Sequence, residues 1–170
     1  MLNILIQETD LFFQAGLQSF FDDFFKHNFH RSITFHLALT NENVSQADII
    51  VLSLCQGETL TCFPELLARQ KGIVIGLVDD ELRFSALPSC FQDIIFLPRR
   101  ASLDRISGVL FIAWFRTQLP GYTLNKKTCF DCQHKGLSRQ QIRIMVNFYR
   151  GLSVVQTANA LKMSEKTVFT

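Results

Sequence analysis

Two continuous apolar runs constrain the fold of this chain more than any other feature. Residues Ala47–Leu54 read ADIIVLSL, and residues Ile73–Val78 read IVIGLV. A strand that is apolar at every position, rather than at every second position, is covered on both of its faces. Such strands are typical of the centre of a parallel sheet. The two runs therefore predict a parallel sheet with helices packed on both sides.

The segments around these runs continue an alternation of strands and helices through residues 1–117. We expect right-handed crossovers between parallel strands and a functional crevice beyond the carboxyl ends of the strands. The predicted strands are Asn3–Gln7, Ile33–Leu39, Ala47–Leu54, Ile73–Val78 and Ile94–Leu97. The predicted helical segments are Leu11–Phe25, Phe63–Gln70 and Ser102–Thr117, and Phe84–Phe91 is expected to be a short helical or irregular piece. In the first of them, Phe12, Ala15, Gly16 and Phe20 form one apolar face, which is extended by Leu17, Phe21, Phe24 and Phe25.

The charge of the chain is divided unevenly along its length. The net charge is +2, but residues 126–170 contain eight Lys or Arg and two acidic residues, a balance of +6, which leaves −4 for residues 1–125. This asymmetry favours two units, the second of them suited to phosphate groups, although a solvated basic surface would have the same composition. We predict a body at 1–117, a linker at 118–136 and a small C-terminal domain at 137–170.

The C-terminal segment has the layout of three short helices, which we call the reader. Ser138, Ser153 and Ser164 each precede a helical pattern and are suitable N-caps, and Gly151 ends the first of the three. A helix, a short break, a second helix, a tight turn and a third helix are typical of a helix-turn-helix unit that binds DNA. A structural three-helix bundle would show the same spacing.

The reader resembles the helix-turn-helix domain of the LuxR/FixJ (NarL-type) transcription regulators of bacteria. The resemblance rests on Leu137-Ser138, Gly151-Leu152-Ser153, Ala158, Leu161 and the run Ser164-Glu165-Lys166-Thr167-Val168. It implies that the chain binds double-stranded DNA as a homodimer or a heterodimer. The DNA contacts implied are those of Ser164, Glu165, Lys166, Thr167 and Thr170.

The reader also departs from the pattern of that family at three points. Thr157 lies where the family has an aliphatic core residue, and Phe169 lies where it often has a lysine. The chain ends inside the expected third helix, so we expect a helix-turn-helix domain that is incomplete at its C-terminus.

With this family in view, residues 1–117 resemble its receiver domain, which implies a flavodoxin-like fold. Active receivers use carboxylates, a metal ion and a lysine at the strand ends, because transfer of a phosphoryl group to a carboxylate must offset negative charge. The corresponding positions of this chain are degenerate, so we expect a receiver that has lost phosphotransfer. These positions are Glu8 and Thr9 for the acidic pair, Ser53 for the phosphate acceptor, Gly76 for the switch hydroxyl and Arg99 for the lysine.

A receiver without its phosphate site, joined to such a reader, is similar to the auxiliary regulators of the RcsA and BglJ type. This similarity implies a regulator that is independent of phosphorylation and acts with a homologous partner regulator. An alternative function is a protein-interaction module that modulates a full-length response regulator without binding DNA. The helix at 102–117, with Trp114 and Phe115, is a candidate pairing surface, or it packs against its own sheet.

Other classes of function find little support in the sequence. We find no Ser-His-Asp set, phosphate-binding loop or dinucleotide-binding glycine pattern, and we expect neither an enzyme nor a cofactor. Cys129, Cys132 and His134 supply half of a zinc site at most, and two incidental linker thiols explain them better. With no apolar run long enough to cross a bilayer and no signal peptide, we expect a cytoplasmic protein with reduced cysteines.

Overall fold

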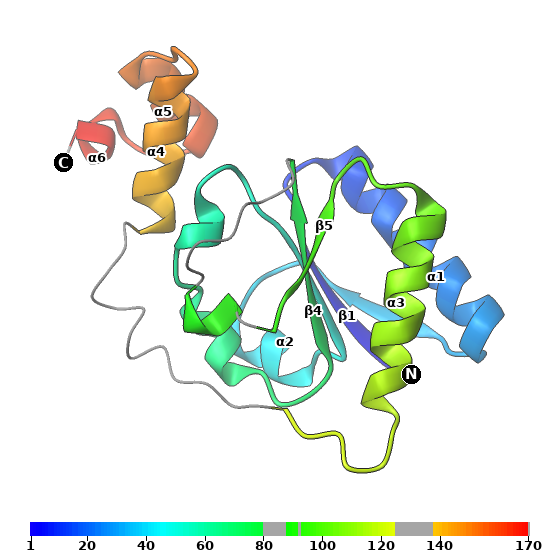
Figure 1. The fold of residues 1–170 in the computed structure, drawn as a ribbon. Coiled ribbons are helices and arrows are strands. Elements are labelled where there is room, and N and C mark those ends of the chain that lie inside the picture. Colours follow the sequence, from blue (N-terminus) through cyan, green and yellow to red (C-terminus); the bar gives the residue numbers. More distant parts are fainter. Residues whose placement is uncertain (80–87, 92, 125–137, 170) are drawn as a thin grey trace.

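A parallel five-stranded sheet forms the body of the protein (Figure 1). The computed structural model describes residues 1–79, 88–91, 93–124 and 138–169. The strand order is β2-β1-β3-β4-β5, and every neighbouring pair is parallel. This is the strand order of the flavodoxin-like fold, so the predicted fold class is confirmed. The strands are β1 (Leu2–Gln7), β2 (Ile33–His36), β3 (Ile49–Ser53), β4 (Ile73–Val78) and β5 (Ile95–Pro98).

Helices cover both faces of this sheet, as the two apolar runs predicted. The helices α1 (Leu11–Phe29) and α3 (Leu103–Thr117) lie on one face. The other face is covered by α2 (Asn41–Gln46) and the short 3-10 helices η2 (Pro64–Ala68) and η3 (Ser89–Phe91), while η1 (Glu58–Leu60) follows β3. The predicted helix at 63–70 is thus a shorter 3-10 helix, and α2 was not predicted.

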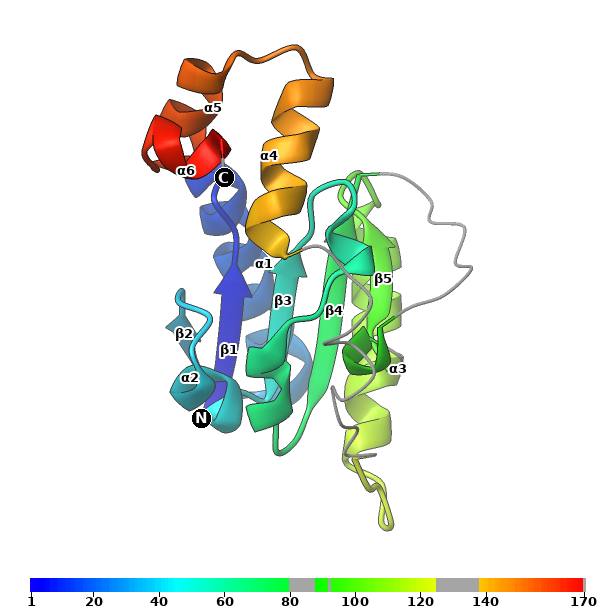
Figure 2. The same cartoon turned by 90° about the vertical axis from the view of Figure 1, so that its left-hand side faces the viewer.

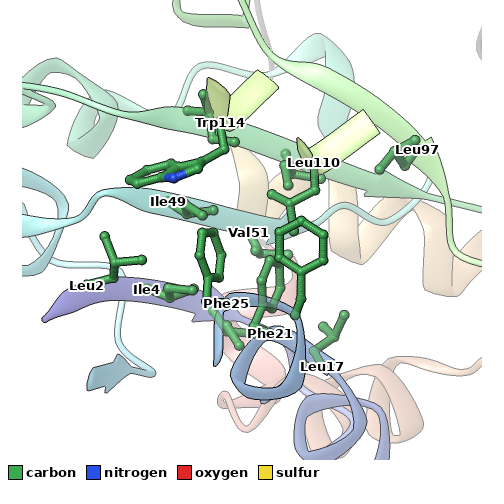
Figure 3. Packing of buried hydrophobic residues seen from close by; sticks show 14 of the residues in the cluster. Leu2, Ile4, Leu17, Phe21, Phe25, Ile49, Val51, Leu97, Leu110 and Trp114 are labelled. Carbon is green, nitrogen blue, oxygen red and sulfur yellow. The ribbon is translucent and has the colours of Figure 1, made fainter. Parts of the chain in front are cut away.

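Aromatic side chains fill the core between the sheet and the pair α1 and α3 (Figure 3). The ring of Phe25 meets the indole of Trp114 edge to face, with the ring centres 5.4 Å apart. Edge-to-face pairs of this kind stabilise a core beyond the area that they bury. Trp114 therefore belongs to the body's own core, which settles the alternative that the sequence left open for this residue.

The buried face of α1 is the C-terminal part of the predicted apolar face, and its N-terminal end, which includes Phe12, was predicted wrongly. The buried residues are Leu17, Phe21, Phe24 and Phe25, whereas Phe12 is 92% exposed. Helix α1 begins at Leu11, after Asp10 caps the backbone N–H groups of Phe12 and Phe13. In the first turn of α1, Leu11 and Phe12 are exposed, whereas Phe13 packs against the core.

Three helices follow the body, namely α4 (Arg139–Tyr149), α5 (Val154–Leu161) and α6 (Glu165–Phe169). Figure 2 shows them above the carboxyl ends of the central strands. The hydrophobic residues of this unit are buried only at Ile142, Ala158 and Val168. Among the described residues, no helix is long and apolar enough to span a membrane.

Candidate functional site

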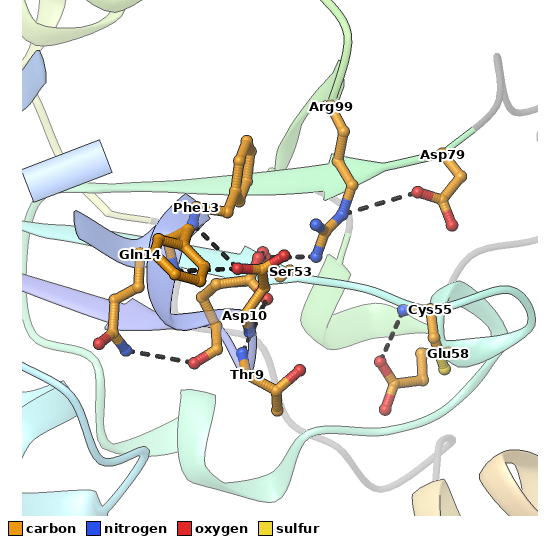
Figure 4. A network of polar contacts seen from close by, with 11 residues as sticks. Thr9, Asp10, Phe13, Gln14, Ser53, Cys55, Glu58, Asp79 and Arg99 are labelled. Carbon is orange, nitrogen blue, oxygen red and sulfur yellow. Dashed lines mark hydrogen bonds and ion pairs between the residues drawn. The ribbon is translucent and has the colours of Figure 1, made fainter. Parts of the chain in front are cut away.

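The strand ends carry a closed polar network centred on Glu8, directly after β1 (Figure 4). One carboxylate oxygen of Glu8 accepts hydrogen bonds from the backbone N–H groups of Thr9 at 2.7 Å and Asp10 at 2.9 Å. The other oxygen accepts from the hydroxyl of Ser53, the last residue of β3, and from the guanidinium of Arg99 at 2.6 Å. The buried carboxylate thus has four donors, which offset the cost of removing its charge from water.

Arg99 extends this network across the edge of the sheet from the end of β5. Its guanidinium forms an ion pair with Glu8, lies 3.6 Å from a carboxylate oxygen of Asp79 and sits 4.9 Å from the ring centre of Phe13. Strands β3 and β4 separate β1 from β5 in the sheet. The Glu8–Arg99 pair therefore spans the crevice in which this fold places its chemistry.

The structure brings together three of the five predicted strand-end positions, Glu8, Ser53 and Arg99. Thr9 contributes its backbone N–H and is itself exposed. Gly76 lies inside β4, in register with Leu52 and Phe96, and a Cβ atom built there would stand 2.9 Å from the Phe96 ring. The residue of β4 in register with Ser53 is Leu77, so Gly76 lies one step before the network.

This arrangement determines which chemistry is available at the strand ends. The hydroxyl of Ser53 donates to Glu8, and the charge of Glu8 is balanced by Arg99. The carboxylate of Asp10 caps α1. In the described part of the chain, no three His, Cys, Asp or Glu side chains are grouped as a metal site would need. Cys129, Cys132 and His134, which the sequence analysis explained better as incidental linker residues than as half of a zinc site, lie outside the described residues.

Side-chain caps define the three helices of the reader. Ser138 and Gln141 form a capping box at the start of α4, and Ser153 and Gln156 form a second one at the start of α5. A capping box satisfies two backbone N–H groups that a helix end leaves unpaired. At the start of α6, the hydroxyl of Ser164 accepts from the backbone N–H of Thr167 at 3.2 Å.

The third helix of the reader has a packed inner side and an exposed outer side. Val168 is buried, together with Ala158 and Thr157 of α5. Helix α5 ends at Lys162 in the left-handed conformation, and α6 begins three residues later. The predicted DNA-binding residues Ser164, Glu165, Lys166 and Thr167 are all exposed, and Thr170 lies outside the described residues.

A buried acidic residue, which the sequence analysis missed, joins the reader to the body. Glu58 of η1 is 0% exposed, and its carboxylate accepts a hydrogen bond from the guanidinium of Arg143 at 2.8 Å. Arg139 approaches the same oxygen to 3.8 Å and stacks over the ring of Phe63, 4.0 Å from its centre. Burial lowers the pKa of the Arg139 guanidinium, and Glu58 opposes that shift. We call the contact among these four residues the docking contact.

Two residues of the loop after β3, Gly57 and Cys55, also lie at the docking contact. Gly57 has a φ of 86°, and a Cβ atom there would lie 3.0 Å from Cγ2 of Ile142, so glycine allows α4 to approach closely. Cys55 donates its backbone N–H to Glu58 at 2.9 Å. Burial, with the nearby Glu58 charge second, raises the pKa of the Cys55 thiol to about 11. The signal available in the sequence was Arg139 and Arg143, which four-residue spacing places on one face of a helix.

Comparisons with known proteins give structural likeness only. No family model matches this chain, and no curated protein is significantly similar to it. The solved structures similar to it include the response regulator ChrA of a heme-sensing two-component system, with 20% identity over 98% of this chain and 83% of that one, at a TM-score of 0.40. A complex of the response regulator RcsB with DNA is similar at 13% identity over 98% and 86% of the two chains, with a TM-score of 0.41.

A further solved structure covers a smaller share of this chain. The N-terminal domain of a response regulator/sensory box/GGDEF protein from Carboxydothermus hydrogenoformans is 16% identical over 66% of this chain and 94% of that one, with a TM-score of 0.46. The chain therefore has the strand order of the flavodoxin-like fold, and the structures similar to it include response regulators.

Proposed function

We propose that this protein is a DNA-binding transcription regulator of the LuxR/FixJ type. The observation that carries the proposal is the outer side of α6, where Ser164, Lys166 and Thr167 are exposed while Val168 of the same helix is packed inward. In helix-turn-helix proteins, the second helix of the motif enters the major groove, and its polar side chains contact bases and phosphates. In the proposed motif, α5 is the first helix, and α6, which follows it after a short turn, is the second helix.

The strand-end network supports regulation without phosphorylation of the body. A hydroxyl occupies the acceptor position at Ser53, and Arg99 is held by Glu8 rather than directed at an incoming phosphoryl group. Phosphoryl transfer to a receiver needs a free carboxylate and a metal ion. The proposed regulator is therefore controlled by a signal other than phosphate.

The outer face of α3 supports action with a homologous partner regulator. Phe111, Ile112 and Phe115 lie on this face and are 45%, 57% and 53% exposed. A single small reader makes few contacts with DNA, so specific affinity calls for two readers on neighbouring half-sites. A second copy or a homologous regulator that covers α3 would supply the second reader.

DNA binding is tested by fluorescence anisotropy with labelled duplexes over a range of salt concentrations. We expect affinity that falls steeply with salt, and the slope of that dependence should decrease by about one in Lys166→Ala, because one phosphate contact is lost. Lys26→Ala, at an exposed position of α1, is the matched control and should leave the slope unchanged. Equal losses in the two variants would remove α6 from the proposed interface.

The exposed face of α3 also favours a second candidate function, a protein-interaction module that modulates a full-length response regulator without binding DNA. This candidate shares the α3 surface but does not need α6. It gains support if the protein co-elutes with a homologous regulator while Lys166→Ala changes neither that complex nor any DNA affinity.

A further inference from the structure

A cavity of 460 Å³ lies between the strand ends of the body and the helices α4 and α5 of the reader. Its volume is within the range of roughly 300–1,000 Å³ that is usual for small-molecule sites. Ligand sites in parallel α/β folds form beyond the carboxyl ends of the strands, and they are also frequent between domains. This cavity satisfies both conditions. The lining residues that matter here are Glu8, Glu58, Asp79, Arg99, Arg143 and Arg150.

The charges around the cavity are balanced in number but not in pairing. Three arginines face three carboxylates, and two pairs are closed, Glu8 with Arg99 at 2.6 Å and Glu58 with Arg143 at 2.8 Å. Asp79 is the third carboxylate, and its 3.6 Å approach to Arg99 is too long for a hydrogen bond. Within the described part of the chain, the Arg150 guanidinium makes no ion pair or side-chain hydrogen bond. Asp79 is therefore held only by a long ion pair with Arg99, and both Asp79 and Arg150 can take a further charged partner.

These features select the chemistry of the ligand. A simple anion would lie beside three carboxylates, and a simple cation would lie beside three guanidinium groups, so either would leave like charges close together. A molecule that carries one positive and one negative charge can place each of them beside a group of opposite charge. We propose that this cavity binds a small zwitterion of amino-acid type, whose carboxylate pairs with Arg150 and whose ammonium group donates to Asp79.

Such a ligand would touch both parts of the protein. Asp79 belongs to the body, whereas Arg150 follows α4 of the reader. Binding would therefore favour the docked arrangement by the difference in affinity between the docked and undocked states. The binding itself does not depend on the proposed DNA function, so failure to bind DNA would leave this inference intact.

Isothermal titration calorimetry of the full chain with individual L-amino acids tests the proposal. We expect at least one amino acid to bind, while its decarboxylated amine and its deaminated acid bind much more weakly. Arg150→Gln and Asp79→Asn should each weaken binding by about 10- to 100-fold, because each removes one charged hydrogen-bond partner. Arg116→Gln and Asp104→Asn, at exposed positions of α3, are the matched controls and should bind normally.

Three results would overturn the proposal. The first is that no amino acid binds the unmodified protein. The second is that the deaminated acid binds as tightly as the amino acid, which would identify a site for simple anions. The third is unchanged affinity in both Arg150→Gln and Asp79→Asn, which would place the bound amino acid elsewhere. Circular dichroism verifies that each variant is folded, and the exposed positions of both residues make unfolding unexpected.

Discussion

Thr157 places a hydroxyl group in the interior of the reader without a partner. The residue is 0% exposed, and its side-chain oxygen has no hydrogen bond among the described residues. We expect Thr157→Val to raise the free energy of unfolding of the reader by about 1 kcal/mol, because the replacement keeps the shape and removes the unpaired polar group. Chemical denaturation followed by circular dichroism measures the change.

The matched control for this prediction is Thr157→Ser, which keeps the hydroxyl and removes the methyl group. It should lower the free energy of unfolding, because a buried methyl group contributes about 1 kcal/mol through packing. A Thr157→Val variant less stable than the unmodified protein would show that the hydroxyl has a partner in solution.

The pKa of the Cys55 thiol depends on Glu58, so it can be used to follow the docking contact. Burial, together with the Glu58 charge, raises the pKa of this thiol from its ordinary value of 9.0 to about 11. The folded protein therefore holds the thiol proton more tightly than the unfolded chain, and this contribution to stability is present below pH 9.0 and is lost as the pH rises toward about 11. We expect slow alkylation of Cys55 at neutral pH, measured by mass spectrometry, and a reaction rate that rises through this interval.

A variant of Glu58 separates the two causes of this shift. Glu58→Gln should lower the pKa of Cys55, because the neighbouring carboxylate disfavours the thiolate. An alkylation profile of Cys55 that is identical in the two proteins would mean that Glu58 does not lie beside the thiol.

Among the elements, α3 combines a core face and an exposed apolar face. Trp114 is packed against Phe25, while Phe115 is 53% exposed. We expect Phe115→Asp to prevent self-association or pairing with a homologous regulator, because a charge would be buried at the centre of the contact. Analytical ultracentrifugation measures the association state. Phe12→Asp, at an exposed phenylalanine of α1, is the control and should associate normally.

Elements with a strong pattern were predicted well, and short irregular ones were not. The continuous apolar runs of β3 and β4 identify central strands, because a strand that is covered on both faces needs apolar residues at nearly every position. Helix α2 has six residues, and Val44 is its only buried side chain, so it carries too little periodicity to be recognised. In α1, Phe12 follows the helical spacing but is 92% exposed, because spacing alone does not show which part of an apolar face is covered by the rest of the fold.

For the molecule as a whole, the docking contact sets the position of the reader relative to the body. Glu58→Gln would leave Arg143 without its charged partner and Arg139 with only the more distant Glu65, and we expect it to weaken docking by about 2 kcal/mol. Small-angle X-ray scattering should then show a larger radius of gyration. Glu65→Gln is the control, because that carboxylate lies 4.0 Å from Arg139 and should change docking little. An unchanged radius in both variants would contradict the predicted role of Glu58.

At the scale of the whole molecule, the sequence predicted which positions lie at the strand ends but not the contacts that they make. Sheet geometry predicted that the strand ends meet at one edge, and the resemblance to receiver domains singled out Glu8, Ser53 and Arg99 among the residues there. Their mutual hydrogen bonds, and the docking of α4 on Glu58, depend on side-chain directions and on contacts between residues far apart in the chain. No spacing rule contains that information, so these contacts had to be seen in three dimensions.

The ion pair between Glu8 and Arg99 also limits which substitutions this protein can accept during evolution. An aspartate introduced at position 53 would bring a second negative charge against Glu8, in place of the hydroxyl that now donates to it. Loss of Arg99 would leave Glu8 buried without its cation. Each single exchange is unfavourable on its own, so we expect these three positions to vary together among descendants of this sequence, and a return to phosphate chemistry would have to pass through less stable intermediates.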